Sequence, residues 1–223
     1  MPDSDVLTPA VEEYLEAIYK MALEGQVIAA RLAERMNVSP PTVADMLRRL
    51  SDKGYVRTSR RDGIKLTKKG LETAESLVRR HRLWERFLTD VLGLEWDAVH
   101  EEACRLEHAM SPKVEKKLSE ILGHPETCPH GHPIPGTRGA RKREKEARPL
   151  SDLEAGDTAV IERVSEEEPK LLQYLGTLGL LPDAKISIKE IAPFRGPMLV
   201  QVCGAQYALG QEVASKIMVK SKK

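Results

Sequence analysis

The spacing of apolar residues in the first quarter of the chain predicts three helices. Over residues 8–23 the apolar positions recur at intervals of three and four, as in a helix that buries one face. Thr8 can cap this helix, and the proline after it fits the first helical position. Two shorter segments of the same kind follow, over residues 29–36 and, behind a capping Ser39, from Pro40 or Pro41 to Lys53. Two short helices joined by a tight turn are typical of a helix-turn-helix.

A strand pattern follows the third predicted helix. Residues 55–57 and 64–66 have the composition of two short strands, and Asp62-Gly63 between them strongly favours a hairpin turn. A helix-turn-helix followed by such a hairpin is a winged helix. Arg60 and Arg61 then lie at the tip of the wing, where they can meet phosphate groups or a minor groove. The alternative is a structural helical hairpin with a solvated face, which the wing disfavours.

A wide apolar face runs along residues 68–92, and the helical pattern continues over residues 96–106 and 114–122 across a break at Ser111-Pro112. This face is wider than one small domain needs for its core. Surplus apolar surface indicates a dimer interface. Burial within a single chain is the alternative.

The last third of the chain changes to short runs rich in strand-forming residues. The predicted strands cover residues 158–164, 185–191, 198–202, 206–209 and 217–219. One helical segment, residues 169–178, interrupts them. Short strands separated by turn residues predict a small barrel of the SH3-like kind.

These patterns predict a mainly α protein with a small β component. Residues 1–72 form a winged helix-turn-helix, residues 73–138 a helical domain, residues 139–149 a basic linker, and residues 150–223 the SH3-like barrel. Residues 124–136, rich in proline and glycine, predict an irregular loop before the linker.

The charge is divided unevenly along the chain. The net charge is only +1, but residues 27–70 hold eleven Lys or Arg and four Asp or Glu, a local charge of +7. Residues 73–135 hold eight basic and eleven acidic residues, a local charge of −3. The basic segment is suited to a polyanion and the acidic, histidine-bearing segment to a cation.

Composition indicates a soluble globular protein, because 41% of the residues are hydrophobic and 31% are charged. No apolar run approaches the roughly 20 residues that cross a bilayer, and the N-terminal residues do not resemble a signal peptide. We expect a cytoplasmic protein without membrane partners, whose three cysteines stay reduced.

The acidic segment carries candidate metal ligands at helical spacing. Carboxylate, thiolate and imidazole groups recur four, seven and eight residues apart, which places them on one helix face. The residues are His81 and Glu85 in one helix, and His100, Cys104, Glu107 and His108 in the next. Single histidines and acids reach a helix face by chance, but six in register favour a divalent transition metal.

Two further groups have weaker patterns. Glu13 and Glu16 are neighbours on the first helix, where acids also favour the helix dipole. Cys128, His130 and His132 do not have the spacing of a standard zinc site, and no CxxC pair accompanies them. The surrounding prolines favour a tight surface turn, and whether these three residues bind anything stays open.

The order of these segments resembles a known family. A winged helix followed by HRLWERFLTDVLGL, VHEEACRLEHAMS and GHPIPG is similar to the diphtheria toxin repressor and manganese transport regulator family of metal-dependent bacterial repressors. The resemblance covers essentially the whole chain. The last seventy or so residues, with LLQYLGTLGLLPDAKISI and LGQEVASKIMV, resemble the FeoA-type SH3-like domain often joined to this family.

The resemblance implies the ligands of two metal sites. The first site comprises Glu13, Cys104, Glu107 and His108, and the second comprises His81, Glu85 and His100. Glu16 matches an additional acid of the manganese branch, and Glu168 is the positional candidate for a ligand from the third domain. The iron branch has methionine where this chain has Glu13 and cysteine at Cys104, whereas the manganese branch has acids at both. Hard oxygen ligands favour Mn(II), with Fe(II) next, and Co(II), Zn(II), Ni(II) or Cd(II) are expected to bind in vitro.

The resemblance also implies a function, that of a homodimeric repressor which binds palindromic operators of metal-uptake genes and controls manganese or iron homeostasis. Ser39, Pro41 and Thr42 are then expected in the major groove, and Arg48, Arg60, Arg61 and Lys65 on the DNA backbone. No small-molecule substrate is expected. A metallohydrolase is a remote alternative, because Cys104 replaces the second histidine of an HExxH motif. A metal sensor or storage protein that does not bind DNA is a third reading, which the winged helix opposes.

Overall fold

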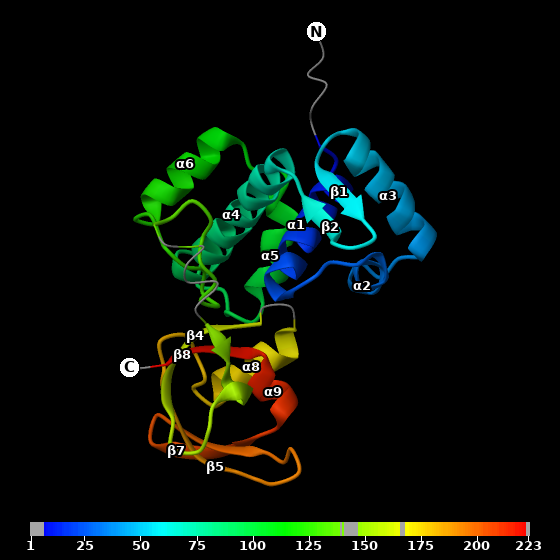
Figure 1. Cartoon of the computed structure of the whole chain (residues 1–223). Coiled ribbons are helices and arrows are strands. Elements are labelled where there is room, and N and C mark those ends of the chain that lie inside the picture. Colours follow the sequence, from blue (N-terminus) through cyan, green and yellow to red (C-terminus); the bar gives the residue numbers. More distant parts are fainter. Residues whose placement is uncertain (1–6, 139, 141–146, 166–167, 222–223) are drawn as a thin grey trace. The chain divides into compact units, whose positions relative to one another are not determined.

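The computed structural model describes residues 7–138, 140, 147–165 and 168–221 (Figure 1). The chain divides into two compact units, one of residues 1–81 and 107–110 and the other of residues 82–106 and 111–223. Helices α4 (Lys68–Asp90) and α5 (Val99–Glu107) contribute residues to both units.

The first unit contains the predicted winged helix. Its elements before α4 are α1 (Pro9–Glu24), α2 (Ala29–Arg35), α3 (Pro40–Asp52), β1 (Val56–Ser59) and β2 (Gly63–Leu66). The Ser39 hydroxyl caps α3 by accepting from the Thr42 amide at 3.4 Å. Strands β1 and β2 pair antiparallel, which confirms the wing. Residues from every element of the unit share one core, among them Leu15, Ile18, Leu32, Val43, Leu50, Ile64 and Val78.

Helix α1 contributes many of the residues of this core. Leu15 and Ile18 on α1 are fully buried in the same cluster as Val43 and Leu50 of α3. Helix α1 and the helix that follows the turn of the helix-turn-helix, α3, therefore share one core.

The second unit contains α6 (Pro112–Ile121) and the predicted barrel. The barrel elements are β3 (Arg148–Pro149), η1 (Leu150–Asp152), β4 (Thr158–Val164), α8 (Pro169–Thr177), β5 (Lys185–Ile191), β6 (Met198–Val202), β7 (Ala205–Leu209), α9 (Gln211–Ser215) and β8 (Ile217–Ser221). The strands form one antiparallel sheet in the order β3-β8-β4-β5-β6-β7. The short β3 and α9 were not predicted, because neither is long enough to show a hydrophobic period. Among the described residues, no helix is long and apolar enough to cross a membrane.

A loop between α6 and β3 is packed against strand β4. Thr127 and Pro133 form an isolated antiparallel bridge, inside which the Cys128 amide donates to the His132 carbonyl at 2.9 Å. The Val164 amide of β4 donates to the His130 carbonyl at 3.0 Å, and His132 Nε2 lies 2.9 Å from the Val164 carbonyl. His130 and His132 of the loop are thus hydrogen-bonded to strand β4 of the barrel.

Candidate metal centre

Three buried side chains from three helices meet in the first unit. Glu16 comes from α1, His81 from α4 and Glu107 from the end of α5, and their ligand atoms all lie within 4.8 Å of one another. His81 Nδ1 is 2.5 Å from Glu107 Oε2. We call these three residues the helix cluster. Two carboxylates and one imidazole in a buried position are a suitable ligand set for a divalent cation.

Burial disfavours the charged form of the Glu107 carboxyl. Its side chain is almost inaccessible, and this desolvation raises the pKa of the carboxyl above its ordinary value. The hydrogen bond to His81 opposes the rise, and the neighbouring charge of Glu16 adds to it. A cation bound to the Glu107 carboxylate would favour its charged form and so offset the cost of its desolvation.

His108 lies beside this cluster, immediately after α5. Its Nδ1 is 2.7 Å from Glu12 Oε2, and its Nε2 is 3.5 Å from Glu107 Oε1 and 4.0 Å from Glu13 Oε1. The Glu13 side chain is 54% exposed, whereas that of Glu12 is 11% exposed. Of the predicted first-site ligands, the structure therefore brings Glu13, Glu107 and His108 together.

Glu12 is a residue that the sequence interpretation missed. Glu12 and Glu16 are four residues apart on α1 and are both mostly buried. Two acids on a helix face that also buries Val11 and Leu15 form a pattern that could have identified Glu12. The predicted pairing of Glu13 with Glu16 relied instead on their spacing and on the family resemblance.

A second group of ligands lies in the second unit. Glu85 of α4 meets Cys128 and His130 of the loop, with all ligand atoms within 4.8 Å of one another and all three residues buried. Glu85 Oε1 lies 3.3 Å from His130 Nδ1, and Cys128 Sγ lies 3.9 Å from the same nitrogen. We call these three residues the loop cluster. A carboxylate, a thiol and an imidazole suit a softer ion than the helix cluster does.

The expectation of a surface turn at Cys128 and His130 is wrong, because the two residues are 1% and 0% exposed. The physical reason is that Arg82 and Arg86 of α4 also donate to carbonyls of the loop, at Pro133 and Thr127. Burial favours the neutral ring of His130, but its hydrogen bonds to Cys128 and Glu85, and their charges, raise its pKa to about 11. A bound metal would take the place of that ring proton.

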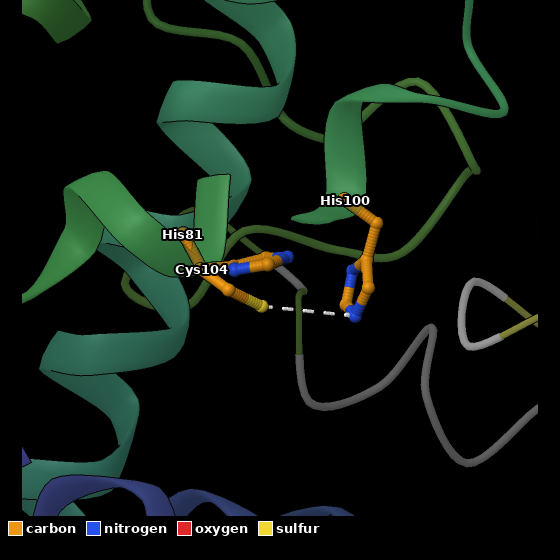
Figure 2. A group of neighbouring side chains, drawn as sticks. All are labelled: His81, His100 and Cys104. Atoms are coloured by element: carbon orange, nitrogen blue, oxygen red, sulfur yellow. Dashed lines mark hydrogen bonds between the residues drawn. The ribbon is translucent and has the colours of Figure 1, made fainter. Parts of the chain in front are cut away.

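His100 and Cys104 lie one helical turn apart on α5. Figure 2 shows the two side chains turned toward each other, with Cys104 Sγ 3.8 Å from His100 Nε2. The other ring nitrogen of His100 is 3.3 Å from Glu85 Oε1. In the second unit, His100 of the predicted second site thus contacts Glu85 of the same predicted site and Cys104, which was predicted for the first site. The other predicted second-site ligand, His81, contacts Glu107 within the first unit.

Two remaining candidates lie elsewhere in the second unit. Glu168 is 55% exposed and forms an ion pair with Lys216 at 2.7 Å. His132 is bound to the Val164 carbonyl of β4. Neither residue belongs to a group of clustered ligands among the described residues.

The winged helix presents the predicted DNA-contacting residues to solvent. All seven of them, Ser39, Pro41, Thr42, Arg48, Arg60, Arg61 and Lys65, are exposed. Ser39 and Thr42 hydroxyls are 2.8 Å apart at the start of α3. A cleft of about 660 Å³ between α3 and the wing is lined by residues that include Arg48 and Arg60. Lys65 pairs with Asp62 at 3.1 Å, which holds the pKa of Asp62 below its ordinary value.

Comparison with known proteins covers nearly the whole chain. Residues 6–64 match the model of the iron dependent repressor N-terminal DNA binding domain, residues 67–136 that of the iron dependent repressor metal binding and dimerisation domain, and residues 148–221 that of the FeoA domain. The iron-dependent repressor IdeR of Mycobacterium tuberculosis is 36% identical, and the alignment covers 96% of this chain and 98% of that protein. The diphtheria toxin repressor of Corynebacterium glutamicum is 34% identical, with 96% and 97% covered.

Several solved structures of regulators are similar to this chain. A manganese-dependent transcriptional repressor in complex with manganese has a TM-score of 0.84 and 33% identity, covering 95% of this chain and 100% of that one. IdeR of T. acidophilum has a TM-score of 0.77 and 27% identity, with 95% and 97% covered. ScaR with bound Cd2+ has a TM-score of 0.82 and 30% identity, with 95% and 99% covered.

Proposed function

The chain belongs to the family of iron-dependent repressors, and on that premise we propose that it represses metal-uptake genes when Mn(II) occupies the helix cluster. It is a metal-dependent DNA-binding transcriptional regulator and not an enzyme. The observation that carries the proposal is the meeting of Glu16, His81 and Glu107, three buried ligand groups from three helices. We propose that the protein works in the cytoplasm, as its DNA partner requires.

The donor atoms support the metal preference. The helix cluster offers two carboxylate oxygens and one imidazole nitrogen, and the half-exposed Glu13 adds a third carboxylate nearby. Hard oxygen donors favour Mn(II), with Fe(II) as the alternative. Imidazole also accepts Co(II), Zn(II), Ni(II) and Cd(II), which we expect to bind in vitro. The loop cluster, with its thiol, is proposed as the second metal site.

Helix α1 connects the helix cluster to the DNA-binding surface. Glu16 lies on α1, one residue after Leu15, which is buried in the core that also contains α3. Without a cation the carboxylates of Glu16 and Glu107 repel each other, and α1 samples more than one position. A divalent cation would supply the positive charge that joins α1 to α4 and α5. Each tenfold tighter binding of the metal to the joined state shifts the free-energy difference between the two states by about 1.4 kcal/mol.

The exposed residues of the winged helix support operator binding. Ser39, Pro41 and Thr42 stand at the start of α3, the part of a recognition helix that reaches base edges. Arg48, Arg60, Arg61 and Lys65 are proposed to contact phosphates. Two winged helices in a symmetric dimer would match a palindromic operator with half-sites about 34 Å apart.

The second unit offers a surface for the homodimer. Its exposed large apolar residues on or beside α4 and α6 are Val91, Leu92, Val114 and Ile121. The matched family model is that of a metal binding and dimerisation domain, and we propose that these side chains are covered in the dimer. Light scattering of the purified protein measures the oligomeric state directly.

The test is metal-activated binding to a labelled fragment of the protein's own promoter region, followed by fluorescence anisotropy. Chelator-treated protein is titrated anaerobically with Mn(II), Fe(II), Co(II) and Zn(II). We expect Mn(II) to activate binding at the lowest free concentration, and Glu107→Gln to abolish activation. Glu101→Gln, on the exposed side of the same helix, is the control and should behave as wild type. Equal DNA affinity with and without metal would refute the proposal.

A further inference from the structure

A chain of contacts in the first unit ends on the ring of His108. Arg80 Nη2 of α4 donates to Glu12 Oε1 of α1 at 2.9 Å, and the other oxygen of Glu12 lies 2.7 Å from His108 Nδ1. Arg80 Nη1 also donates to the Glu107 carbonyl at 3.1 Å. The side chains of Arg80, Glu12 and His108 are 13%, 11% and 15% exposed, so water competes weakly for these contacts.

The contact at Nδ1 decides what Nε2 can do. A neutral imidazole carries one proton, and a carboxylate oxygen can only accept a hydrogen bond. With Glu12 as the partner, the proton belongs on Nδ1, and Nε2 keeps the lone pair that a metal requires. Nε2 is the nitrogen that faces Glu107 and Glu13, at 3.5 and 4.0 Å.

The two oxygens of Glu12 have separate partners. Arg80 holds one and His108 the other, so the carboxylate is fixed in orientation. Its neighbour Glu13 is half exposed and lies on the Nε2 side of the ring. The two consecutive acids on α1 therefore face different nitrogens of the ring, Glu12 at Nδ1 and Glu13 at Nε2.

We propose that Glu12, held by Arg80, is a positioning residue of the metal centre that fixes the tautomer and orientation of His108. The proposal rests on the proposed function and takes His108, whose Nε2 lies 3.5 Å from Glu107 of the helix cluster, as a further ligand of the same Mn(II). A carboxylate behind a ligand histidine orients the ring and raises its basicity, and loss of such a partner lowers metal affinity by about 10- to 100-fold. Glu12 is not itself a ligand in this scheme.

The experiment compares Glu12→Gln with Glu13→Gln. Arginine can only donate, so in Glu12→Gln the Arg80 guanidinium should take the oxygen of the new side-chain amide and turn its NH₂ group toward His108. The ring proton should then move from Nδ1 to Nε2. The ¹⁵N shifts of His108 in metal-free protein at alkaline pH report this tautomer, with His108→Gln used to assign the signals.

The expected results separate the two acids. Glu12→Gln should reverse the His108 tautomer and weaken Mn(II) binding, followed by electron paramagnetic resonance of free Mn(II), by about 10- to 100-fold. Glu13→Gln should leave the tautomer unchanged. An Nε2–H tautomer in the wild type, or Mn(II) affinity within twofold of wild type in Glu12→Gln, would overturn the positioning role. Failure of the wild type to bind Mn(II) would instead overturn the proposed function. The two failures can be distinguished because the His108 tautomer is measured in metal-free protein and does not depend on Mn(II) binding.

Discussion

Replacing Gly131 with Ala should loosen the contact between the loop cluster and strand β4. A Cβ added at Gly131 would lie 2.0 Å from the Glu162 carbonyl oxygen and 2.9 Å from Arg163 Cα. Both are backbone atoms, which cannot rotate away as a side chain can. Because real Cβ contacts are essentially never below 3.0 Å, the loop and β4 must separate by about 1 Å.

The cost can be worked out from the bonds that cross this contact. The hydrogen bond from the Val164 amide to the His130 carbonyl is 3.0 Å long, and His132 Nε2 lies 2.9 Å from the Val164 carbonyl. Each such bond contributes about 0.5–1.5 kcal/mol net, so losing both costs about 1–3 kcal/mol. Gly131 also has a φ of +88°, and alanine in that region adds about 1 kcal/mol.

Gly123→Ala is the matched control. Gly123 has a φ of +69°, but nothing lies within 4 Å of an added Cβ. Both variants therefore carry similar backbone strain, and only Gly131→Ala carries the clash. The assay is amide hydrogen exchange at Val164, because local opening is read without assuming that the whole chain unfolds in one step.

We expect exchange at Val164 to be about 5- to 150-fold faster in Gly131→Ala than in Gly123→Ala, the equivalent of about 1–3 kcal/mol. Metal affinity of the loop cluster should fall in the same variant, since Cys128 and His130 lose their fixed positions. Equal protection of Val164 in the two variants would show that the close approach of Gly131 does not hold the loop.

Three further predictions concern DNA, metal and pH. Arg61→Ala should weaken DNA binding broadly and reduce the slope of log affinity against log salt by about one unit, whereas Arg195→Ala, an exposed arginine of the barrel, should leave the slope unchanged in the same titration. Cys128→Ser should lower Zn(II) or Cd(II) stoichiometry measured by equilibrium dialysis, and the exposed Cys203→Ser should not. Burial raises the pKa of Glu107, so the folded protein favours the protonated carboxyl and becomes less stable as pH rises through that pKa. Because glutamine does not ionise, the stability of metal-free Glu107→Gln relative to wild type should increase from acid to neutral pH in thermal unfolding. A stability difference that does not change with pH would contradict this.

The fold was largely predictable because its elements have strong local patterns. The strands at 158–164, 185–191 and 198–202 and the hairpin at Asp62-Gly63 are present as predicted. Periodicity also located α1, α3 and α4 to within one or two residues. In contrast, the two-residue β3 is formed by pairing with β8, and no local pattern specifies such a contact.

The clusters were less predictable because their members are brought together by tertiary contacts. Spacing placed Glu13 and Glu16 together, but the direction of each side chain depends on what α1 packs against, and Glu12 rather than Glu13 is buried beside His108. Cys128 and His130 were discounted because their spacing matches no standard motif. Their partner Glu85 lies more than forty residues earlier in the chain, and the arginines of α4 that hold the loop carry no sign of this role in the sequence.

The two clusters also change the meaning of the mixed resemblance to manganese and iron regulators. The family resemblance assigned the oxygen donor of Glu13 and the thiol of Cys104 to one site, although these donors favour different metals. The structure offers two buried groups with different donors, the helix cluster with oxygen and nitrogen only and the loop cluster with a thiol. The helix cluster belongs to the first unit, where its residue Glu16 lies on α1, which shares a core with the winged helix. The loop cluster belongs to the second unit, where its loop is hydrogen-bonded to β4 of the barrel. We therefore propose that one chain binds a hard ion at the helix cluster and a softer ion at the loop cluster, so that metal selectivity is a property of each cluster.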